Sequence, residues 1–146
     1  MMGSGMEKHA GWHFGLDLAA DGKKWMRGAR QGFEVRDLGA SACTNGSYHA
    51  QLGRRNPDEP IDPDLKQWHA HDLDFQMVFV LRGWARFEYE GQGERLLNEG
   101  DCLHQLPGIK HREFHCSDDY MVLEITSPAK FETRLVDPPE GREVLK

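Results

Sequence analysis

Hydrophobic and polar residues alternate along much of this chain, so that every second residue is apolar. In 84–90 (WARFEYE), Ala85, Phe87 and Tyr89 fall on one face of an extended chain, and charged residues fall on the other. The segment 75–81 (FQMVFVL) is rich in β-branched and aromatic residues, which are enriched in strands. Similar segments between turn residues predict strands at 33–38, 47–53, 75–81, 84–90, 94–97, 101–106, 111–116 and 120–126.

Helical periodicity is nearly absent from the chain. Residues 18–29 (LAADGKKWMRGA) are the only segment in which we expect a short helix, and Gly22 weakens it. Residues 54–64 contain three prolines, which cannot donate a ladder hydrogen bond, so we expect a loop or an excursion at a sheet edge. Many short strands with turns between them predict an all-β sandwich or barrel.

The chain has 146 residues, the size of one domain. We expect an N-terminal arm at 1–32, a β-barrel at 33–131 and a C-terminal tail at 132–146. The arm shows no sustained hydrophobic period. The tail contains Pro138 and Pro139, and we expect it to be irregular or to pack on a neighbouring molecule.

Charge and composition narrow the classes of partner. The net charge is −6 and lysine and arginine form no cluster, which argues against nucleic acid or an anionic membrane as the main partner. No apolar run is long enough to span a bilayer, and the start of the chain lacks the pattern of a secretory signal. The odd set of Cys43, Cys102 and Cys116, with no CxxC pair, favours reduced thiols in the cytoplasm. We therefore expect a small-molecule substrate or a second copy of the chain as the partner.

Three histidines and one amide carry the candidate chemistry. His69 and His71 are separated by one residue, so both imidazoles point to the same side of a strand. Gln76 interrupts the apolar run that follows, and His111 begins a later strand directly after the turn PGIK. Strand starts can converge in a β-barrel. Three imidazoles and one amide oxygen would then suit a divalent transition metal.

Two motifs resemble those of the cupin superfamily. They are H-x-H-x4-Q-x6-G at 69–83 and GDCLHQLPGIKH at 100–111, and the resemblance covers roughly residues 45–126. It implies an antiparallel β-barrel or jelly roll, with His69, His71, Gln76 and His111 as the metal ligands.

The sequence departs from the family pattern in four places. Pro63 replaces a glycine, Leu106 stands where proline is expected, His115 replaces a frequent asparagine, and Gln76 replaces the usual glutamate. The last departure matters most for chemistry. With only neutral protein ligands, a divalent ion keeps its full charge, which favours an anionic, metal-chelating substrate.

Further polar residues are candidates for roles around the metal. Alternation in 111–116 places His111, Glu113 and His115 on one face, so Glu113 and His115 are candidate acid–base groups. Any of three arginines could hold a substrate carboxylate: Arg54, Arg55 and Arg86. His49 and Gln51 share a face, as do Cys102 and His104, and their directions stay open.

The family resemblance leaves several functions open, because cupins include dioxygenases, isomerases, lyases, decarboxylases and ligand-binding regulators. The leading hypothesis is a dioxygenase with Fe(II), acting on a small chelating organic substrate, with Ni, Zn or Mn as alternative metals. A second is a metal-dependent isomerase or lyase of a sugar or hydroxy acid without redox chemistry. A third is a non-catalytic module that binds a small ligand. Small cupins generally pair, so we expect a homodimer in which the N-terminal arm lies across the partner.

Overall fold

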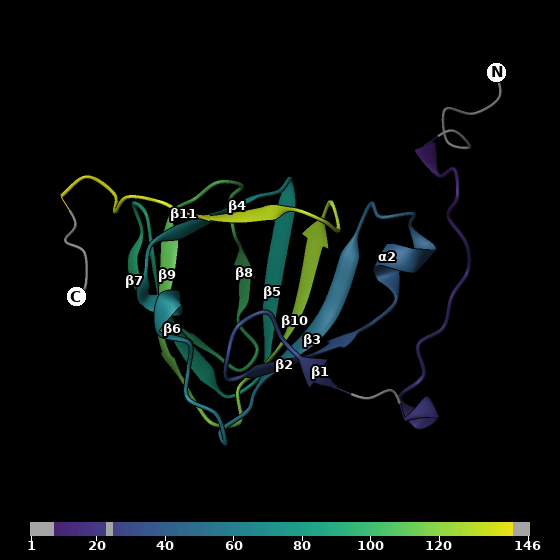
Figure 1. The fold of residues 1–146 in the computed structure, drawn as a ribbon, viewed down its shortest axis with the longest axis horizontal. Coiled ribbons are helices and arrows are strands. Elements are labelled where there is room, and N and C mark those ends of the chain that lie inside the picture. Colours follow the sequence, from purple (N-terminus) through teal and green to yellow (C-terminus); the bar gives the residue numbers. More distant parts are fainter. Residues whose placement is uncertain (1–7, 23–24, 142–146) are drawn as a thin grey trace.

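The computed structural model describes residues 8–22 and 25–141, which form two antiparallel sheets packed face to face (Figure 1). The six-stranded sheet has the order β1 (Met26–Arg27), β2 (Phe33–Asp37), β3 (His49–Arg55), β10 (Met121–Ser127), β5 (Phe75–Arg82) and β8 (Cys102–His104). The five-stranded sheet has the order β11 (Glu132–Leu135), β4 (His69–Asp72), β9 (His111–Cys116), β6 (Trp84–Tyr89) and β7 (Gly93–Asn98). Short helical turns occur at η1 (Ala19–Asp21), α2 (Ala40–Cys43) and η2 (Pro63–Lys66).

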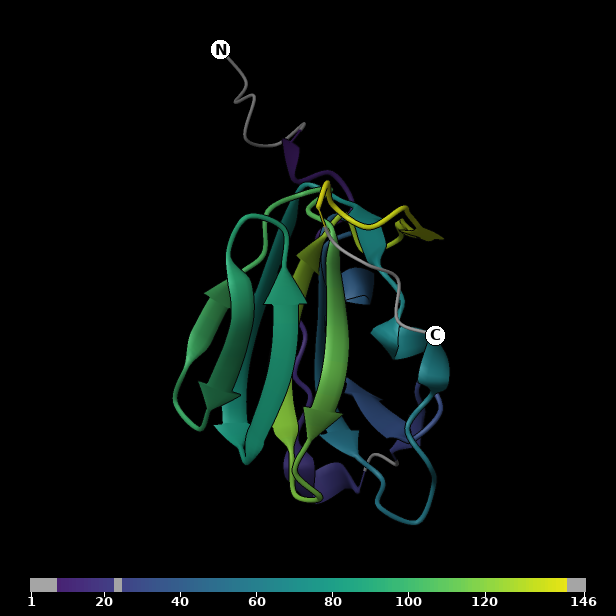
Figure 2. The ribbon, with the colours of Figure 1, turned by 90° about the vertical axis from the view of Figure 1, so that its left-hand side faces the viewer.

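The predicted all-β antiparallel fold is confirmed in its jelly-roll form. The strand pairings of the described residues give two separate sheets, not one closed barrel. Figure 2, turned to face the side on which β6, β7 and β9 lie in Figure 1, shows the strands running up and down the molecule with their broad faces toward the viewer. None of the helices in 8–22 and 25–141 is long and apolar enough to cross a membrane.

The apolar core fills one end of the space between the sheets. Its members are Val80, Ala85, Phe87, Tyr89, Cys116 and Tyr120. Gly83 closes this end as the turn between β5 and β6, with φ +72°. A Cβ at this position would collide with the side chains of Ser117 and Asp119, so the turn requires glycine. The opposite end of the same strands holds polar side chains and a cavity.

One sequence-based expectation about the ends of the chain is wrong, and a second is wrong in part. The described part of 18–29, residues 18–22 and 25–29, contains no α-helix: Ala19–Asp21 make a 3-10 turn, which ends at Gly22 in the left-handed conformation, and β1 lies at Met26–Arg27. The tail is not wholly irregular, because Glu132–Leu135 pair with β4. All four residues of β11 are exposed, so this strand is held through its backbone and leaves no hydrophobic pattern in the sequence.

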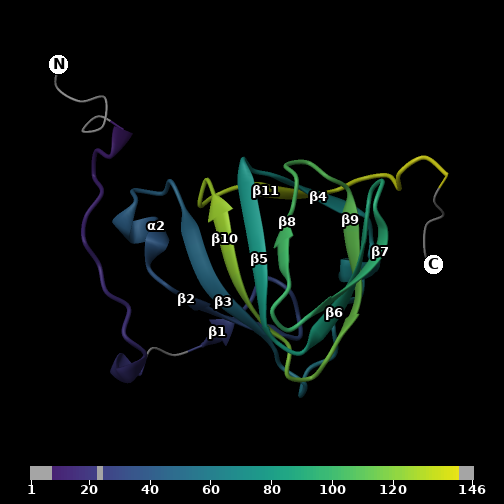
Figure 3. The ribbon, with the colours of Figure 1, turned by 180° about the vertical axis from the view of Figure 1, so that it is seen from behind.

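The residues before β1 lie outside the sandwich. In Figures 1 and 3 the segment 8–22 runs on the side of α2, away from the two sheets. It touches the body at few places, among them the Asp17–Arg36 ion pair and the contact of Trp12 with Tyr48. Phe14 and Leu16 are 86% and 71% exposed. The division into arm, barrel and tail stays a prediction.

Candidate metal centre

Three histidines from two neighbouring strands meet at the polar end of the sandwich. His69 on β4 lies directly opposite His111 on β9, and His71 is on the same side of β4 as His69. The ring centroids of His69 and His111 are 4.2 Å apart, and those of His71 and His111 are 4.9 Å apart. One ring nitrogen from each residue lies within 4.8 Å of the other two. The sequence separates these residues, and the β4–β9 pairing brings them together.

Each imidazole contacts a backbone carbonyl or a hydroxyl group through its Nδ1 nitrogen. His69 Nδ1 is 2.8 Å from the carbonyl oxygen of Gln67, and His111 Nδ1 is 3.1 Å from that of Ile109. A carbonyl oxygen only accepts, so both Nδ1 atoms carry the proton. His71 Nδ1 lies 2.7 Å from the hydroxyl of Thr133 on β11. In His69 and His71 no described residue bonds Nε2, whereas His111 Nε2 lies 3.2 Å from Gln105 Nε2, a contact that a bound metal ion would replace.

The surroundings keep these imidazoles neutral. Burial lowers the pKa of His69, and it lowers that of His71 to about 4 and that of His111 to about 3. Repulsion from the neighbouring histidines and the positive charge of Arg30 are smaller contributions to these same lowered pKa values of His71 and His111. A neutral imidazole offers a lone pair, so this donor set fits a divalent transition metal.

Gln76 is buried next to the histidines and belongs to a chain of hydrogen bonds. Its Nε2 donates to Glu124 Oε2 at 3.2 Å, and its Oε1 accepts from Gln105 Nε2 at 3.2 Å. Gln105 Nε2 is also 3.2 Å from His111 Nε2. Because Glu124 holds the amide nitrogen, the amide oxygen of Gln76 faces the side of Gln105 and the histidines. The role of Gln76 as the fourth metal ligand stays a prediction, and the orientation of its amide oxygen suits that role.

The site borders a cavity of about 620 Å³ between the sheets. The cavity wall includes all three histidines, Gln76 and four carboxylate residues: Glu34, Asp64, Glu113 and Glu124. Burial and, to a smaller extent, repulsion from Glu124 raise the pKa of Glu113 to about 7, against the opposing effect of Arg30. Burial also raises the pKa of Glu124, and the hydrogen bond from Gln76 opposes this. The volume is in the range of small-molecule sites.

His115 does not share the face of His111 and Glu113, and that expectation is wrong. Arg86 pairs with His115, but Phe87 pairs with Glu113, so Phe114 is an extra residue on β9. This bulge reverses the alternation beyond it. His115 is exposed beside Trp84, with ring centroids 5.4 Å apart, and is not part of the cavity wall.

None of the three arginines proposed for a substrate carboxylate is part of the cavity wall. Arg54 pairs with Glu34 at 3.0 Å and covers the ring of Trp25. Arg55 donates to backbone carbonyl groups, including that of Gly32 at 2.7 Å. Arg86 is exposed on β6. Arg30, which sequence reasoning passed over, lines the cavity instead.

The two pairs whose direction stayed open are also resolved. Gln51 lines the cavity and donates to Glu124 at 3.3 Å, while His49 is bonded to Gln51. Cys102 and His104 are both exposed.

The sequence reasoning also missed Gln105 and Glu124. Glu124 had a detectable signal: it is the only charged residue in YMVLEIT, and it lies opposite Val78 on the inner face.

Comparisons with known proteins bear on the fold. No protein-family model matches the sequence, and no curated protein does either. Among solved structures, the polyketide cyclase RemF from Streptomyces resistomycificus has a TM-score of 0.63 at 13% identity, over 87% of this chain and 89% of that one. A sugar phosphate isomerase of the cupin superfamily from Silicibacter pomeroyi has 0.62 at 19% identity, over 85% and 82%. KdgF from Halomonas sp. has 0.58 at 15% identity, over 81% and 96%.

The chain has the cupin fold. The expectation drawn from the two motifs is therefore confirmed at the level of architecture. At identities of 13–19% the likeness concerns the fold alone, and the chemistry has to be argued from the side chains of this chain.

Proposed function

We propose that this chain is a divalent-metal-dependent enzyme that acts on a small, anionic, metal-chelating organic substrate without net oxidation. One observation carries the proposal: three neutral imidazoles and the carboxyl group of Glu113 border the same cavity of about 620 Å³. A metal held by His69, His71 and His111, with Gln76 as a further ligand, would act as a Lewis acid on a substrate oxygen.

Glu113 is the residue suited to move a proton in such a reaction. It projects from β9 two residues after His111, so it faces the same interior as the histidines. A carboxylate there takes a proton from the substrate carbon next to a carbonyl group and returns it to another substrate atom. The proton is conserved, so the net reaction is an isomerisation, or an elimination when a leaving group departs. The similar structures include proteins named as an isomerase, a cyclase and DMSP lyases, which supports this class.

The Fe(II) dioxygenase remains the second candidate. It is favoured by the small number of protein ligands, which leaves coordination positions for a substrate and for O2. Against it, a typical Fe(II) oxygenase site has two histidines and one carboxylate, whereas this site offers three imidazoles and an amide.

Metal exchange and oxygen dependence separate the two candidates. Protein loaded with Zn²⁺ or Mn²⁺ and kept under nitrogen should convert hydroxy or keto acids, and in D2O the product should carry deuterium. Glu113→Gln should lose the exchange and keep the metal, while Glu94→Gln, an exposed change on β7, should alter neither. Activity that needs Fe(II) and consumes O2 would favour the dioxygenase. Tight ligand binding without turnover of any kind would favour the non-catalytic module.

We also propose that the chain works as a homodimer. The outer face of the six-stranded sheet carries Met77, Phe79, Leu123 and Ile125, which form two cross-strand pairs and are only half-buried. Together with the exposed apolar residues of the segment 8–22, this face is suited to contact a second copy. Phe79→Glu should give a monomer in light scattering, whereas Glu94→Gln should leave a dimer. A wild-type protein that is monomeric at micromolar concentration would contradict this.

The cytoplasm remains the proposed location. Cys43, Cys102 and Cys116 carry free thiols, which persist in a reducing compartment.

A further inference from the structure

The turn that joins β1 to β2 places a positive charge at the cavity. Arg30 lies in this turn, is half-buried and lines the cavity. It is the only arginine or lysine among the described residues of the cavity wall. The wall otherwise contains histidines, amides, carboxylates and apolar groups.

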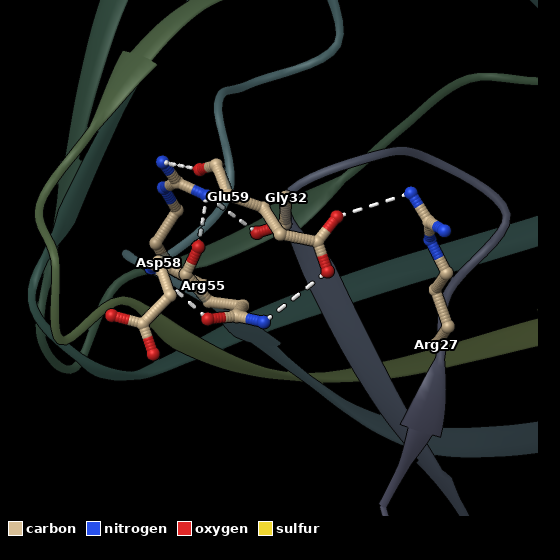
Figure 4. A network of polar contacts seen from close by, with 6 residues as sticks. Arg27, Gly32, Arg55, Asp58 and Glu59 are labelled. Atoms are coloured by element: carbon tan, nitrogen blue, oxygen red, sulfur yellow. Dashed lines mark hydrogen bonds and ion pairs between the residues drawn. The ribbon is translucent and has the colours of Figure 1, made fainter.

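Hydrogen bonds from the end of β3 and the loop that follows it hold this turn in place. Arg55 donates to the carbonyl oxygens of Gly32 at 2.7 Å and of Glu59 at 2.6 Å, and the amide of Asn56 donates to Gly32 at 2.8 Å. Arg27, at the end of β1 where the turn begins, forms an ion pair with Glu59 of the loop at 3.1 Å (Figure 4).

Close packing at Gly32 adds to this restraint. Gly32 has φ +90°, and a Cβ there would lie 2.6 Å from Arg55 Nη1 and 2.8 Å from the carbonyl oxygen of Pro60. The backbone that carries Arg30 is therefore fixed against the rest of the protein. A ligand that binds Arg30 then has to order only the side chain, which lowers the entropic cost of binding.

The guanidinium group of Arg30 has no hydrogen bond or ion pair with any described residue, unlike its neighbours. Arg27, Arg36 and Arg54 each pair with a carboxylate. The charge of Arg30 acts instead on the metal-site histidines and on Glu113. A half-buried guanidinium with its donors available, next to a site for a divalent cation, is complementary to an anion that reaches both.

We propose that Arg30 binds an acidic group of the substrate, a carboxylate or a phosphate, while another part of the same substrate chelates the metal. This inference rests on the proposed function and narrows its substrate class. The substrate is then a hydroxy or keto acid with a second acidic group, and Arg30 is a specificity-determining residue on the turn between β1 and β2.

Two pairs of probe anions test the proposal on Co²⁺-loaded protein. L-Lactate and L-malate share the hydroxy-acid unit that chelates a metal, and malate adds a carboxylate. D-Glycerate and 3-phospho-D-glycerate make the same comparison for a phosphate. Titration calorimetry should give wild-type protein at least about tenfold tighter binding of the doubly acidic member of one pair, the size expected for a charge-assisted contact. The pair with the larger ratio identifies the acidic group.

The variants decide whether Arg30 causes this preference. Arg30→Gln should reduce the ratio to within about twofold and leave the affinity for the singly acidic member and the Co²⁺ content unchanged. Arg30→Lys should keep part of the ratio, because a lysine retains the charge but not the planar fork. If Arg30→Gln does not fold by circular dichroism, the reduced ratio in Arg30→Lys carries the test. Arg86→Gln, an exposed arginine on β6, is the matched control and should behave as wild type.

The outcomes separate this inference from the proposed function. A wild-type protein that holds Co²⁺ and shows no preference within either pair overturns the role of Arg30 and leaves the metal site standing. A preference that persists in Arg30→Gln also overturns it. A wild-type protein that holds no Co²⁺, Zn²⁺ or Mn²⁺ overturns the proposed function and this inference with it.

Discussion

The two ends of the sandwich are built from the same three strands and differ in what those strands bury. On β5 the inner residue is Val80 at one end and Gln76 at the other, and both are almost fully buried. On β9 the contrast is Cys116 against His111, whereas on β6 both Ala85 and Tyr89 belong to the core cluster and Tyr89 also lines the cavity. Alternation determines which side chains point inward, and their chemical type determines whether the interior becomes core or site.

The difference has an energetic meaning. Apolar side chains at the closed end gain free energy by leaving water, whereas the polar side chains at the open end lose hydration and recover it only through partners. Those partners are present: Gln67, Ile109 and Thr133 for the histidines, and Glu124 and Gln105 for Gln76. The closed end should therefore control stability, and the open end should control metal binding.

The largest expected effect is the loss of metal from His111→Ala. Removing one of three imidazoles should weaken Co²⁺ or Zn²⁺ binding by more than the roughly 10–100-fold that loss of an outer partner costs. Competition with a chelating dye measures this, and the midpoint of unfolding in the metal-free state should change little. His104→Ala removes an exposed histidine of β8 and should bind metal as wild type. Equal metal content in both variants would contradict the three-histidine site.

Val80→Ala should destabilise the apolar core at the closed end and leave metal binding unchanged. Val80 has no exposed surface, and the variant removes two methyl groups and leaves a small cavity, which should lower the free energy of unfolding by about 2 kcal/mol. Urea denaturation of the metal-free protein measures the change. Leu96→Ala, at a residue that is 48% exposed, should cost less than about 0.5 kcal/mol. A loss of metal stoichiometry in folded Val80→Ala would mean that the two ends are not independent.

Thr133→Val should show that β11 supports the site. The variant keeps the shape of the side chain and removes the hydroxyl group that bonds His71 Nδ1 at 2.7 Å, so metal affinity should fall by about tenfold. Thr133→Ser keeps the hydroxyl and should retain the affinity. The stability of the metal-free protein should be unchanged in both, because Thr133 is exposed. Identical metal affinities in the Thr133→Val and Thr133→Ser variants would show that the hydroxyl group of β11 does not support the site.

The smallest expected effect concerns Gln76 and Glu124. Gln76→Glu alone places two carboxylates within hydrogen-bonding distance, so they should share a proton and gain little metal affinity. The double variant Gln76→Glu, Glu124→Gln restores a donor and an acceptor with their positions exchanged, and should raise the affinity a few-fold. If the single variant gains as much as the double, Glu124 is not the reason for an amide at position 76.

The period-two pattern was sufficient for most of the fold. Residues 75–81 and 84–90 form β5 and β6 as predicted, and the motifs at 69–83 and 100–111 were enough to name the three histidines that meet. The failures share a cause. The Phe114 bulge, which moves His115 outward, and the edge strand β11 depend on backbone pairing between distant segments, which leaves no local mark in the sequence.

Arg30 and Glu124 illustrate a second limit. Arg30 lies before the predicted barrel, in a stretch without hydrophobic period, and only the docking of its turn on the loop 54–62 brings it to the cavity. Arg54 and Arg55 are closer to the motifs in sequence and have other partners. Proximity along the chain was a poor guide to which cation lines the site.

The sequence by itself determined the all-β architecture, the inward-facing sides of most strands and the identity of the three clustered histidines, because alternation and motif spacing are local properties. Tertiary structure alone decided which nitrogen of each imidazole contacts the backbone or Thr133, which carboxylate lies beside the amide and which arginine reaches the cavity. Those features depend on strand pairing and turn docking between residues far apart in the chain, where the geometry of the whole sandwich sets the neighbours of each side chain.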